Sequence, residues 1–165
     1  MSADIGRMSG LTTSLIRSFA ASAPSGNVSL ALGEPGWPLP EPAREALRRW
    51  ASDGDLCTYG PNQGIPELVS AITDLVGTPV ANVMVTSGSQ AALYALITAH
   101  VEPGRAVAIP DPGFPAYRTL THLAGGSTLT YPLAADGSLN AQGLVDALDR
   151  HTEAGGAPVR MLILN

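Results

Sequence analysis

Apolar residues in the second half of the chain follow two alternating patterns, and together these predict the fold class. Short apolar runs are expected to form strands at 83–86, 106–110, 127–131 and 159–164, and amphipathic segments are expected to form helices at 89–101, 114–124 and 140–151. Apolar strands that alternate with helices indicate a mostly parallel sheet that helices cover on both faces. We therefore predict an α/β fold with three layers, α/β/α.

The first half of the chain predicts separate helices joined by loops. Leu15, Ile16 and Phe19 recur at helical spacing, and the Ala-Pro-Ser-Gly sequence after residue 22 ends that helix. A short extended segment is expected at 28–32, before a loop rich in Pro and Gly. Two further helices are expected at 41–50 and 65–76, each with a proline in its first turn.

Composition limits the functional classes. The chain has 165 residues, of which 45% are hydrophobic, and this suffices for one core. A net charge of -5 argues against non-specific binding of nucleic acid, which needs basic patches. No apolar run reaches the roughly 18 residues that a membrane-spanning helix needs, and the single cysteine, Cys57, fits a reducing compartment. We expect a cytoplasmic protein. We expect no metal site, because no histidine has a partner at ligand spacing.

The segment Val83–Ile97 combines an apolar run, a turn of small polar residues and a helix start. A helix start leaves backbone N–H groups without partners, and together with the positive end of the helix dipole they attract anions, often phosphate. Gly88, Ser89 and Gln90 are the candidate phosphate-binding residues. The alternative is an ordinary capped helix start, which small polar residues also satisfy.

The next loop, Asp111–Tyr117, holds an aromatic residue, Phe114, between two prolines that restrict it. Taken alone, such an aromatic is more often a core or lid residue. A phosphate-binding turn beside a fixed aromatic suggests a flat, phosphorylated cofactor.

Four motifs carry a resemblance to a known family. They are Leu32-Gly-Glu-Pro35, Tyr59-Gly-Pro-Asn-Gln-Gly-Ile-Pro-Glu-Leu68, Thr86-Ser-Gly-Ser-Gln-Ala-Ala-Leu93 and Asp111-Pro-Gly-Phe-Pro-Ala-Tyr117. In this order the chain, from about Leu30 to Asn165, resembles the N-terminal portion of a class I/II aminotransferase, a fold-type I enzyme that depends on pyridoxal 5'-phosphate (PLP). The resemblance implies that residues 1–50 are an N-terminal arm and small-domain segment. It implies that residues 51–165 are the first half of the PLP-binding large domain.

The resemblance also implies roles for individual residues. Gly88, Ser89 and Gln90 would hold the cofactor phosphate, and Phe114 would stack on the pyridine ring. Tyr59 would reach across a homodimer interface to the phosphate of the partner subunit, although a loop tyrosine beside glycine is common.

Gly33 would let the carboxylate of an amino-acid or 2-oxo-acid substrate approach the backbone. A plain turn glycine is the alternative for this residue.

The family's catalytic residues are expected beyond Asn165. All nine basic residues are arginines, so the chain lacks the lysine that forms the family's Schiff base. We expect a fragment that is inactive alone, with 83–86 detached from the other strands and with sheet edges that favour aggregation.

Three alternatives remain open on the sequence alone. A PLP-dependent C–S lyase would share the same N-terminal motifs. The effector domain of a transcriptional regulator would need a basic DNA-binding domain, for which the 27 residues before Val28 are too few. The third alternative is a non-catalytic remnant.

Overall fold

The computed structural model describes residues 6–9, 11, 14–28, 30, 33–52 and 58–165. The chain forms two compact units, one made of Met1–Ser14 with Ser87–Asn165 and the other of Leu15–Thr86. The predicted domain boundary after residue 50 remains a prediction. Cys57 lies outside the described residues, and so do residues 29, 31 and 32 of the extended segment expected at 28–32. Over the part of the chain that is described, no helix combines the length and the apolar character needed to span a membrane.

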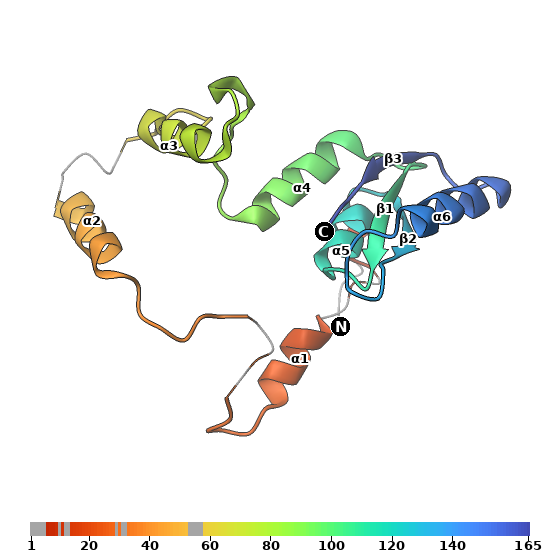
Figure 1. Ribbon diagram of the computed structural model, residues 1–165, viewed down its shortest axis with the longest axis horizontal. Coiled ribbons are helices and arrows are strands. Elements are labelled where there is room, and N and C mark those ends of the chain that lie inside the picture. The colour runs from red at the N-terminus through yellow and green to blue at the C-terminus, as the bar shows by residue number, and fades with distance from the viewer. Residues whose placement is uncertain (1–5, 10, 12–13, 29, 31–32, 53–57) are drawn as a thin grey trace. The chain divides into compact units, whose positions relative to one another are not determined.

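The helices and strands follow one another along the chain as the patterns predict, except at 83–86 (Figure 1). In order they are η1 (Gly6–Met8), α1 (Leu15–Ser22), α2 (Glu41–Ser52), α3 (Pro66–Val76), η2 (Val80–Asn82), α4 (Ser89–His100), β1 (Ala106–Asp111), α5 (Ala116–Leu123), β2 (Ser127–Pro132), α6 (Ala141–Glu153) and β3 (Val159–Leu162).

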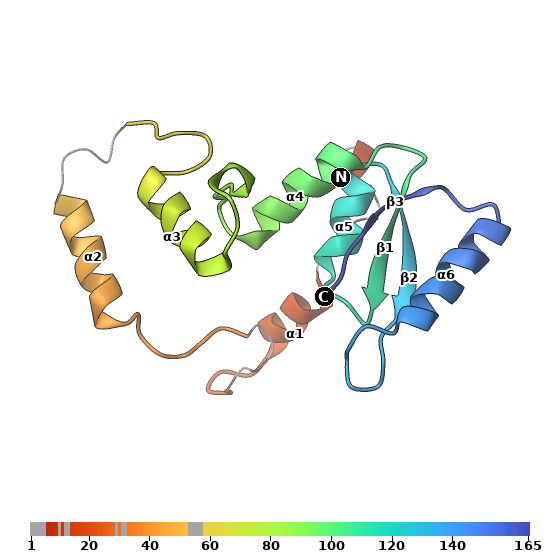
Figure 2. The same ribbon diagram turned by 45° about the horizontal axis from the view of Figure 1, so that its top comes forward.

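The larger unit contains a three-stranded parallel sheet in the order β2-β1-β3. Helices α4 and α5 pack on one face of the sheet and α6 packs on the other, so the predicted α/β/α layering is confirmed (Figure 2). Parallel strands need such crossover helices, and the helices bury both faces of the sheet. The carboxyl ends of all three strands therefore meet at one edge, which is where open α/β sheets bind ligands.

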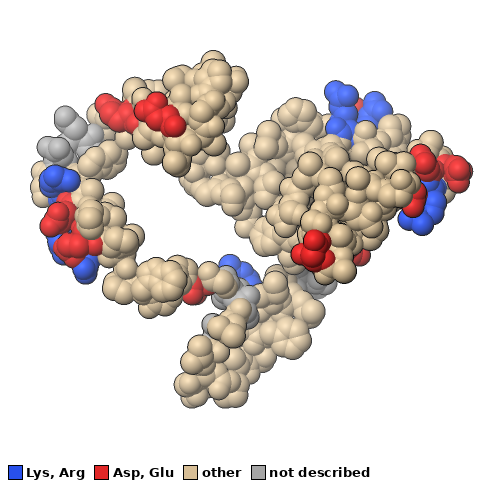
Figure 3. All heavy atoms as spheres, viewed as in Figure 1, with Lys and Arg blue, Asp and Glu red and all other residues tan. Residues whose placement is uncertain are grey.

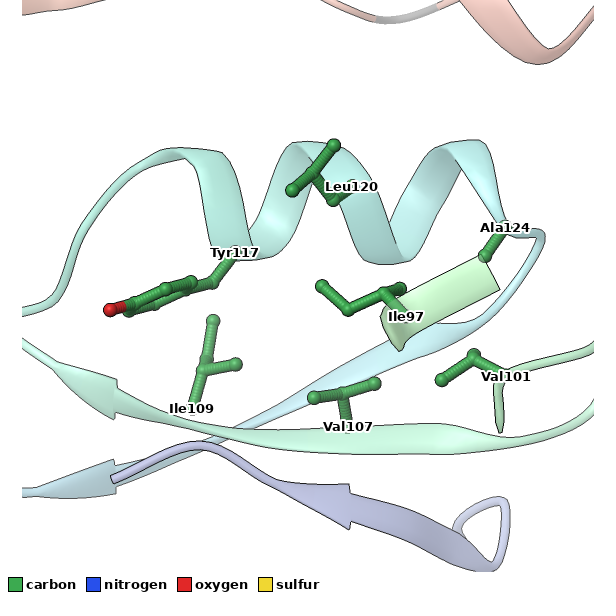
Figure 4. Close-up of a cluster of buried hydrophobic side chains, with 7 residues drawn as sticks. All are labelled: Ile97, Val101, Val107, Ile109, Tyr117, Leu120 and Ala124. Atoms are coloured by element: carbon green, nitrogen blue, oxygen red, sulfur yellow. The ribbon is translucent and has the colours of Figure 1, made fainter. Parts of the chain in front are cut away.

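The central strand β1 forms the core, and residues 106–109 are buried on both faces. Val107 and Ile109 face the helix layer and belong to a cluster of seven buried side chains (Figure 4). These are Ile97, Val101, Val107, Ile109, Tyr117, Leu120 and Ala124. Ala108 faces the opposite layer, where it packs against Tyr131 and Ala147. This alternation of faces follows from the period of two along a strand.

Pro110 interrupts the hydrogen bonds between β1 and β3. The Ile163 N–H donates to the Ala108 oxygen at 2.9 Å, so the next donor of β1 toward β3 would be residue 110, which has no N–H. The Tyr131 hydroxyl from β2 donates to the Ile163 oxygen at 2.6 Å instead. A side chain thus satisfies a carbonyl that the proline leaves without its ladder partner.

The prediction of a strand at 83–86 is wrong, because these residues belong to no strand in the structure. Their observed partner is the loop around Gln63. The Val85 N–H donates to the Gln63 oxygen at 2.9 Å, and the Gln63 side-chain Nε2 donates to the Val80 and Val83 oxygens at 2.6 and 2.7 Å. An apolar run becomes a strand only beside another strand, and the neighbour of 83–86 is a loop.

Gly64 completes this contact in the smaller unit. A Cβ at Gly64 would lie 2.5 Å from Val85 Cγ2, and the backbone φ of Gly64 is +117°. Only glycine allows both the backbone conformation and the close approach. Val69 of α3 and Val83 are the buried hydrophobic residues that the structure describes in this unit. We call the contact of Gln63 and Gly64 with residues 80–85 the Gln63 clamp.

Helix α2 carries interleaved acidic and basic side chains (Figure 3). Glu41 forms ion pairs with Arg44 and with Arg48, the second at 3.0 Å. These pairs are solvent-exposed, so each contributes at most about 1 kcal/mol to stability.

Candidate active site

The turn before α4 has the backbone geometry of an anion site. Gly88 is the N-cap residue of α4, with φ 79° and ψ 167°, a region that is almost exclusive to glycine. A Cβ at Gly88 would meet no atom within 4 Å, so the requirement for glycine comes from the backbone alone. The first turn of α4 contains no acidic residue that would repel an anion. The first N–H groups of the helix, including those of Ser89 and Gln90, have no acceptor inside the helix.

Packing at the other end of α4 fixes the direction in which the helix start points. Ile97 is fully buried against the sheet, and the Val101 N–H caps the helix by donating to the Ile97 oxygen at 2.8 Å. Because α4 then leads directly to the start of β1, the Gly88 turn lies toward the carboxyl end of that strand. The positive end of the helix dipole is therefore directed to the ligand-binding edge of the sheet.

The loop after β1 presents Phe114 at the same edge of the sheet. The Asp111–Pro112 peptide bond is cis. A Cβ at Gly113 would fall against the Pro110 carbonyl oxygen, so the chain turns tightly at this residue. The Phe114 ring is 46% exposed, and its edge contact with Tyr117 has a centroid distance of 5.6 Å and an interplanar angle of 81°. Such T-shaped pairs are a favoured geometry of aromatic rings. The partly exposed Phe114 ring is therefore held in place by its contact with Tyr117.

Tyr117 connects this loop to the end of β3. The residue is only 6% exposed, and its hydroxyl donates to Asn165 Oδ1 at 2.9 Å. Figure 4 shows the hydroxyl directed past Ile109 toward the carboxyl end of β1. Ala108 is paired with Leu162, so the same register counted onward brings Asn165 level with Asp111 at the edge of the sheet.

The buried tyrosines also define the electrostatics of this edge. Burial raises the pKa of the Tyr131 hydroxyl above its ordinary value, and the nearby Tyr117 hydroxyl raises it further. Tyr131 therefore stays protonated as a hydrogen-bond donor well into the alkaline range. Among the residues that the structure describes, no group of three His, Cys, Asp or Glu side chains could hold a metal ion.

Four of the six predicted site residues lie in one compact unit: Gly88, Ser89, Gln90 and Phe114. The other two, Tyr59 and Gly33, belong to the smaller unit. Tyr59 is fully exposed, and Gly33 is exposed with a φ of 63° and open space where a Cβ would stand. The roles of all six residues remain predictions.

Sequence reasoning missed Tyr117, Asn165 and Gln63. Tyr117 closes the motif 111–117, and its position three residues after Phe114 places both on one side of a helical turn. That spacing could have indicated the ring contact. The contact with Asn165 spans 48 residues, and no local pattern signals it.

Comparisons with known proteins agree with these observations. A family model described as aminotransferase class I and II matches residues 25–165. The chain is 30% identical over 146 residues to an aspartate aminotransferase of Pyrococcus horikoshii, covering 84% of this chain and 35% of the relative. It is 32% identical over 117 residues to LL-diaminopimelate aminotransferase 2 of a Nostoc species, covering 66% of this chain and 30% of the relative.

Solved structures give the same result. The chain matches a mutant Thermus thermophilus aspartate aminotransferase in complex with tryptophan with a TM-score of 0.77 and 26% identity, covering 89% of this chain and 42% of that one. It matches the aspartate aminotransferase of Rhizobium meliloti with a TM-score of 0.74 and 26% identity, covering 86% and 39%. The chain thus spans about a third of the length of the Pyrococcus and Nostoc relatives.

Proposed function

Because the chain belongs to the class I and II aminotransferase family, we propose that it is the part of a PLP-dependent aminotransferase that binds the cofactor's phosphate and one face of its ring. The observation that carries this proposal is the Gly88 turn. It opens a 12-residue helix with glycine-only backbone geometry, and this helix packs on one face of the parallel sheet. Members of this family depend on PLP.

The residues of the larger unit fit this cofactor. The N–H groups at Gly88, Ser89 and Gln90 would donate to the phosphate oxygens, with the α4 dipole adding a favourable field. Phe114 would lie on the ring, because its partly exposed side chain is held by an edge contact rather than buried. When bound, PLP withdraws electrons from the substrate carbon and so lets an amino group move from an amino acid to a 2-oxo acid.

This chain would contribute binding and orientation to the reaction. The phosphate turn would hold one end of the cofactor, and Phe114 would restrict the tilt of its ring. Gly33 would admit the substrate carboxylate, since its lack of a side chain leaves the backbone open to close approach. Tyr59 would donate its hydroxyl to the phosphate held by a second subunit of a homodimer, for which its full exposure is suitable.

Transamination is favoured over C–S lysis because the Pyrococcus and Nostoc relatives and both matched solved structures carry aminotransferase names. We place the protein in the cytoplasm. Its substrates on this proposal are an amino acid and a 2-oxo acid, and nucleic acid is not among its partners.

Binding of pyridoxamine 5'-phosphate to the chain tests the proposal. This form of the cofactor has no aldehyde, so it cannot react with the N-terminal amine and reports only non-covalent binding. By isothermal titration calorimetry, we expect it to bind at least about tenfold more tightly than pyridoxamine, because charge-assisted hydrogen bonds to phosphate are strong. Inorganic phosphate should compete with pyridoxamine 5'-phosphate.

Two matched glycine variants locate the phosphate. Gly88→Ala should weaken binding of pyridoxamine 5'-phosphate about tenfold, because alanine is strained in this region of φ and ψ. Gly88→Ala should have little effect on the affinity for pyridoxamine, which has no phosphate. Gly137→Ala introduces alanine at another positive φ, +85°, with open space around the Cβ, in the turn between β2 and α6, and it should leave both affinities unchanged. Equal affinities of the two ligands for the unaltered chain would refute the proposal.

A further inference from the structure

Tyr117 makes two specific contacts at the strand tips that the proposed cofactor site does not itself use. Its ring forms a T-shaped pair with the Phe114 ring at a centroid distance of 5.6 Å, and its hydroxyl donates to Asn165 Oδ1 at 2.9 Å. The first contact fixes a ring on the loop after β1, and the second reaches the residue beyond β3. One buried side chain therefore connects the ends of two adjacent strands.

We propose that Tyr117 is a positioning residue that sets the plane of the Phe114 ring for a flat aromatic ligand. This inference rests on the proposed function, since the flat ligand is the cofactor ring. It adds a residue that acts through Phe114, and it assigns the Asn165 amide as the anchor of that residue.

Burial explains why Tyr117 can act in this way. The residue is 6% exposed and packs among Ile97, Ile109 and Leu120, so its ring cannot swing away from its position. Phe114 has no such enclosure, because nearly half of its surface is exposed. A buried ring next to an exposed ring determines the orientation of the exposed one.

The hydroxyl fixes the remaining freedom of Tyr117. Packing alone leaves small variations in the two side-chain torsions of Tyr117, and a hydrogen bond from the hydroxyl to a fixed acceptor removes them. The Asn165 Oδ1 atom is that acceptor, and a buried hydroxyl without an acceptor would destabilise the folded chain.

The chain contains a close control for these contacts. Tyr131 is also a buried tyrosine of the same sheet, and its hydroxyl also donates one short hydrogen bond. Its acceptor, however, is the backbone oxygen of Ile163, and no contact with Phe114 is involved. Tyr131→Phe therefore removes a buried hydroxyl while the ring contact between Tyr117 and Phe114 and the hydrogen bond between Tyr117 and Asn165 remain.

Three ligands separate positioning of the ring from general damage. Tyr117→Phe should weaken binding of both pyridoxamine and pyridoxamine 5'-phosphate by the same factor, about threefold to tenfold, which corresponds to one net hydrogen bond. Tyr117→Leu, which also removes the ring edge, should weaken both further. Binding of inorganic phosphate, measured alone, should not change in either variant, whereas a partly unfolded chain would lose all three ligands. Tyr131→Phe should leave all three affinities unchanged.

The role of the Asn165 anchor is tested by a double-mutant cycle. Asn165→Ala should have the same effect as Tyr117→Phe, and the double variant should be no worse than either single one, because both remove the same hydrogen bond. Additive losses would overturn the coupling of the two residues.

A spectroscopic measurement requires no ligand. The chain contains only two phenylalanines, Phe19 and Phe114, so incorporation of 4-fluorophenylalanine yields two ¹⁹F resonances. In Tyr117→Leu the Phe114 resonance should move, because the ring edge beside it is gone, while the Phe19 resonance stays in place. An unmoved Phe114 resonance would overturn the inference.

The outcomes for the inference and for the proposed function differ. If the unaltered chain binds both pyridoxamine ligands and Tyr117→Phe binds them equally well, the inference fails and the proposed function stands. If the unaltered chain binds neither ligand, the proposed function fails and the inference fails with it.

Discussion

The Tyr131 hydroxyl donates to the carbonyl that a backbone N–H at residue 110 would bond if that residue were not proline. It donates to the Ile163 oxygen at 2.6 Å across the central strand. Proline within a sheet is ordinarily confined to edge strands, because it removes a ladder donor. Here β1 is the central strand. A single side chain therefore allows a proline in the middle of the sheet, directly before the loop that carries Phe114.

Removal of this hydroxyl should destabilise the larger unit. Tyr131→Phe leaves the Ile163 oxygen without its donor, and we expect a loss of about 1–3 kcal/mol in the free energy of unfolding at neutral pH. Urea unfolding followed by circular dichroism measures this loss. Tyr94→Phe, at a half-exposed tyrosine of α4, is the control and should have little effect. Equal stability of Tyr131→Phe and the unaltered chain would show that the Ile163 oxygen finds another donor.

The raised pKa of Tyr131 makes the difference in unfolding free energy between the unaltered chain and Tyr131→Phe depend on pH. Its pKa in the folded chain lies above the value of about 10 in the unfolded chain, first because of burial and then because of Tyr117. The stabilisation is complete below pH about 10 and is lost as the pH rises through the folded pKa, since the unfolded chain ionises first. The stability gap between the unaltered chain and Tyr131→Phe should therefore narrow above pH about 10. A gap that is constant across this range would contradict the shift.

The elements that could be predicted from sequence are those whose pattern is local. Helix α6 shows its amphipathic spacing within 13 residues, and β1 is an apolar run buried on both faces. The segment 83–86 has an equally apolar composition, yet it forms no strand. A strand depends on its neighbour, and composition does not show which segment that neighbour is.

The candidate site divides in the same way. Gly88 could be recognised because a glycine between small polar residues before a helix is a local pattern. Phe114 could be recognised from its flanking prolines. The contact between Tyr117 and Asn165 depends on how β1 and β3 align, and this register is a property of the folded sheet. Local patterns therefore predict the loops at Gly88 and Phe114, whose roles remain predictions, but not the side-chain contacts that form between distant segments.

The Gln63 clamp should be sensitive to a single methyl group. Gly64→Ala forces alanine to a φ of +117° and places its Cβ against Val85, so we expect a local loss of about 2–4 kcal/mol from backbone strain and overpacking. Hydrogen exchange of the Val85 N–H, which donates to the Gln63 oxygen, should become correspondingly faster. This amide reports the clamp directly.

Gly77→Ala is the matched control for this prediction. Gly77 also has a positive φ, +68°, but a Cβ there would meet no atom within 4 Å. It should show the backbone strain without the clash, so exchange at Val85 should change little. If both substitutions accelerated hydrogen exchange of the Val85 N–H equally, the contact between residue 64 and Val85 would not explain the effect of Gly64→Ala.

At the scale of the whole molecule, β3 leaves one side of its backbone without a strand partner among the described residues. The Ile163 N–H faces β1, so the N–H of Leu162 points to the open side. Apolar surface lies exposed at the end of the strand, because Leu162 is 44% exposed and the following Leu164 is 61% exposed, while Arg160 is the exposed charged residue of β3. Open apolar edges of this kind pair with other chains.

We expect the chain to self-associate through this edge in a concentration-dependent manner. Leu162→Pro removes the outward N–H and leaves the pairing with β1 intact, so it should shift sedimentation velocity profiles toward the monomer. Ile163→Pro removes an N–H that β1 uses and should unfold the sheet instead. Undiminished association of Leu162→Pro would exclude this edge as the contact.

The Gln63 clamp also has a consequence for inheritance and for library design. Gln63 and Gly64 fit residues 80–85 through three hydrogen bonds and one glycine-sized gap. A genetic crossover between codons 64 and 80 would join one parent's loop to another parent's segment. Recombinants with breakpoints in that interval should survive selection less often than those with breakpoints just outside it.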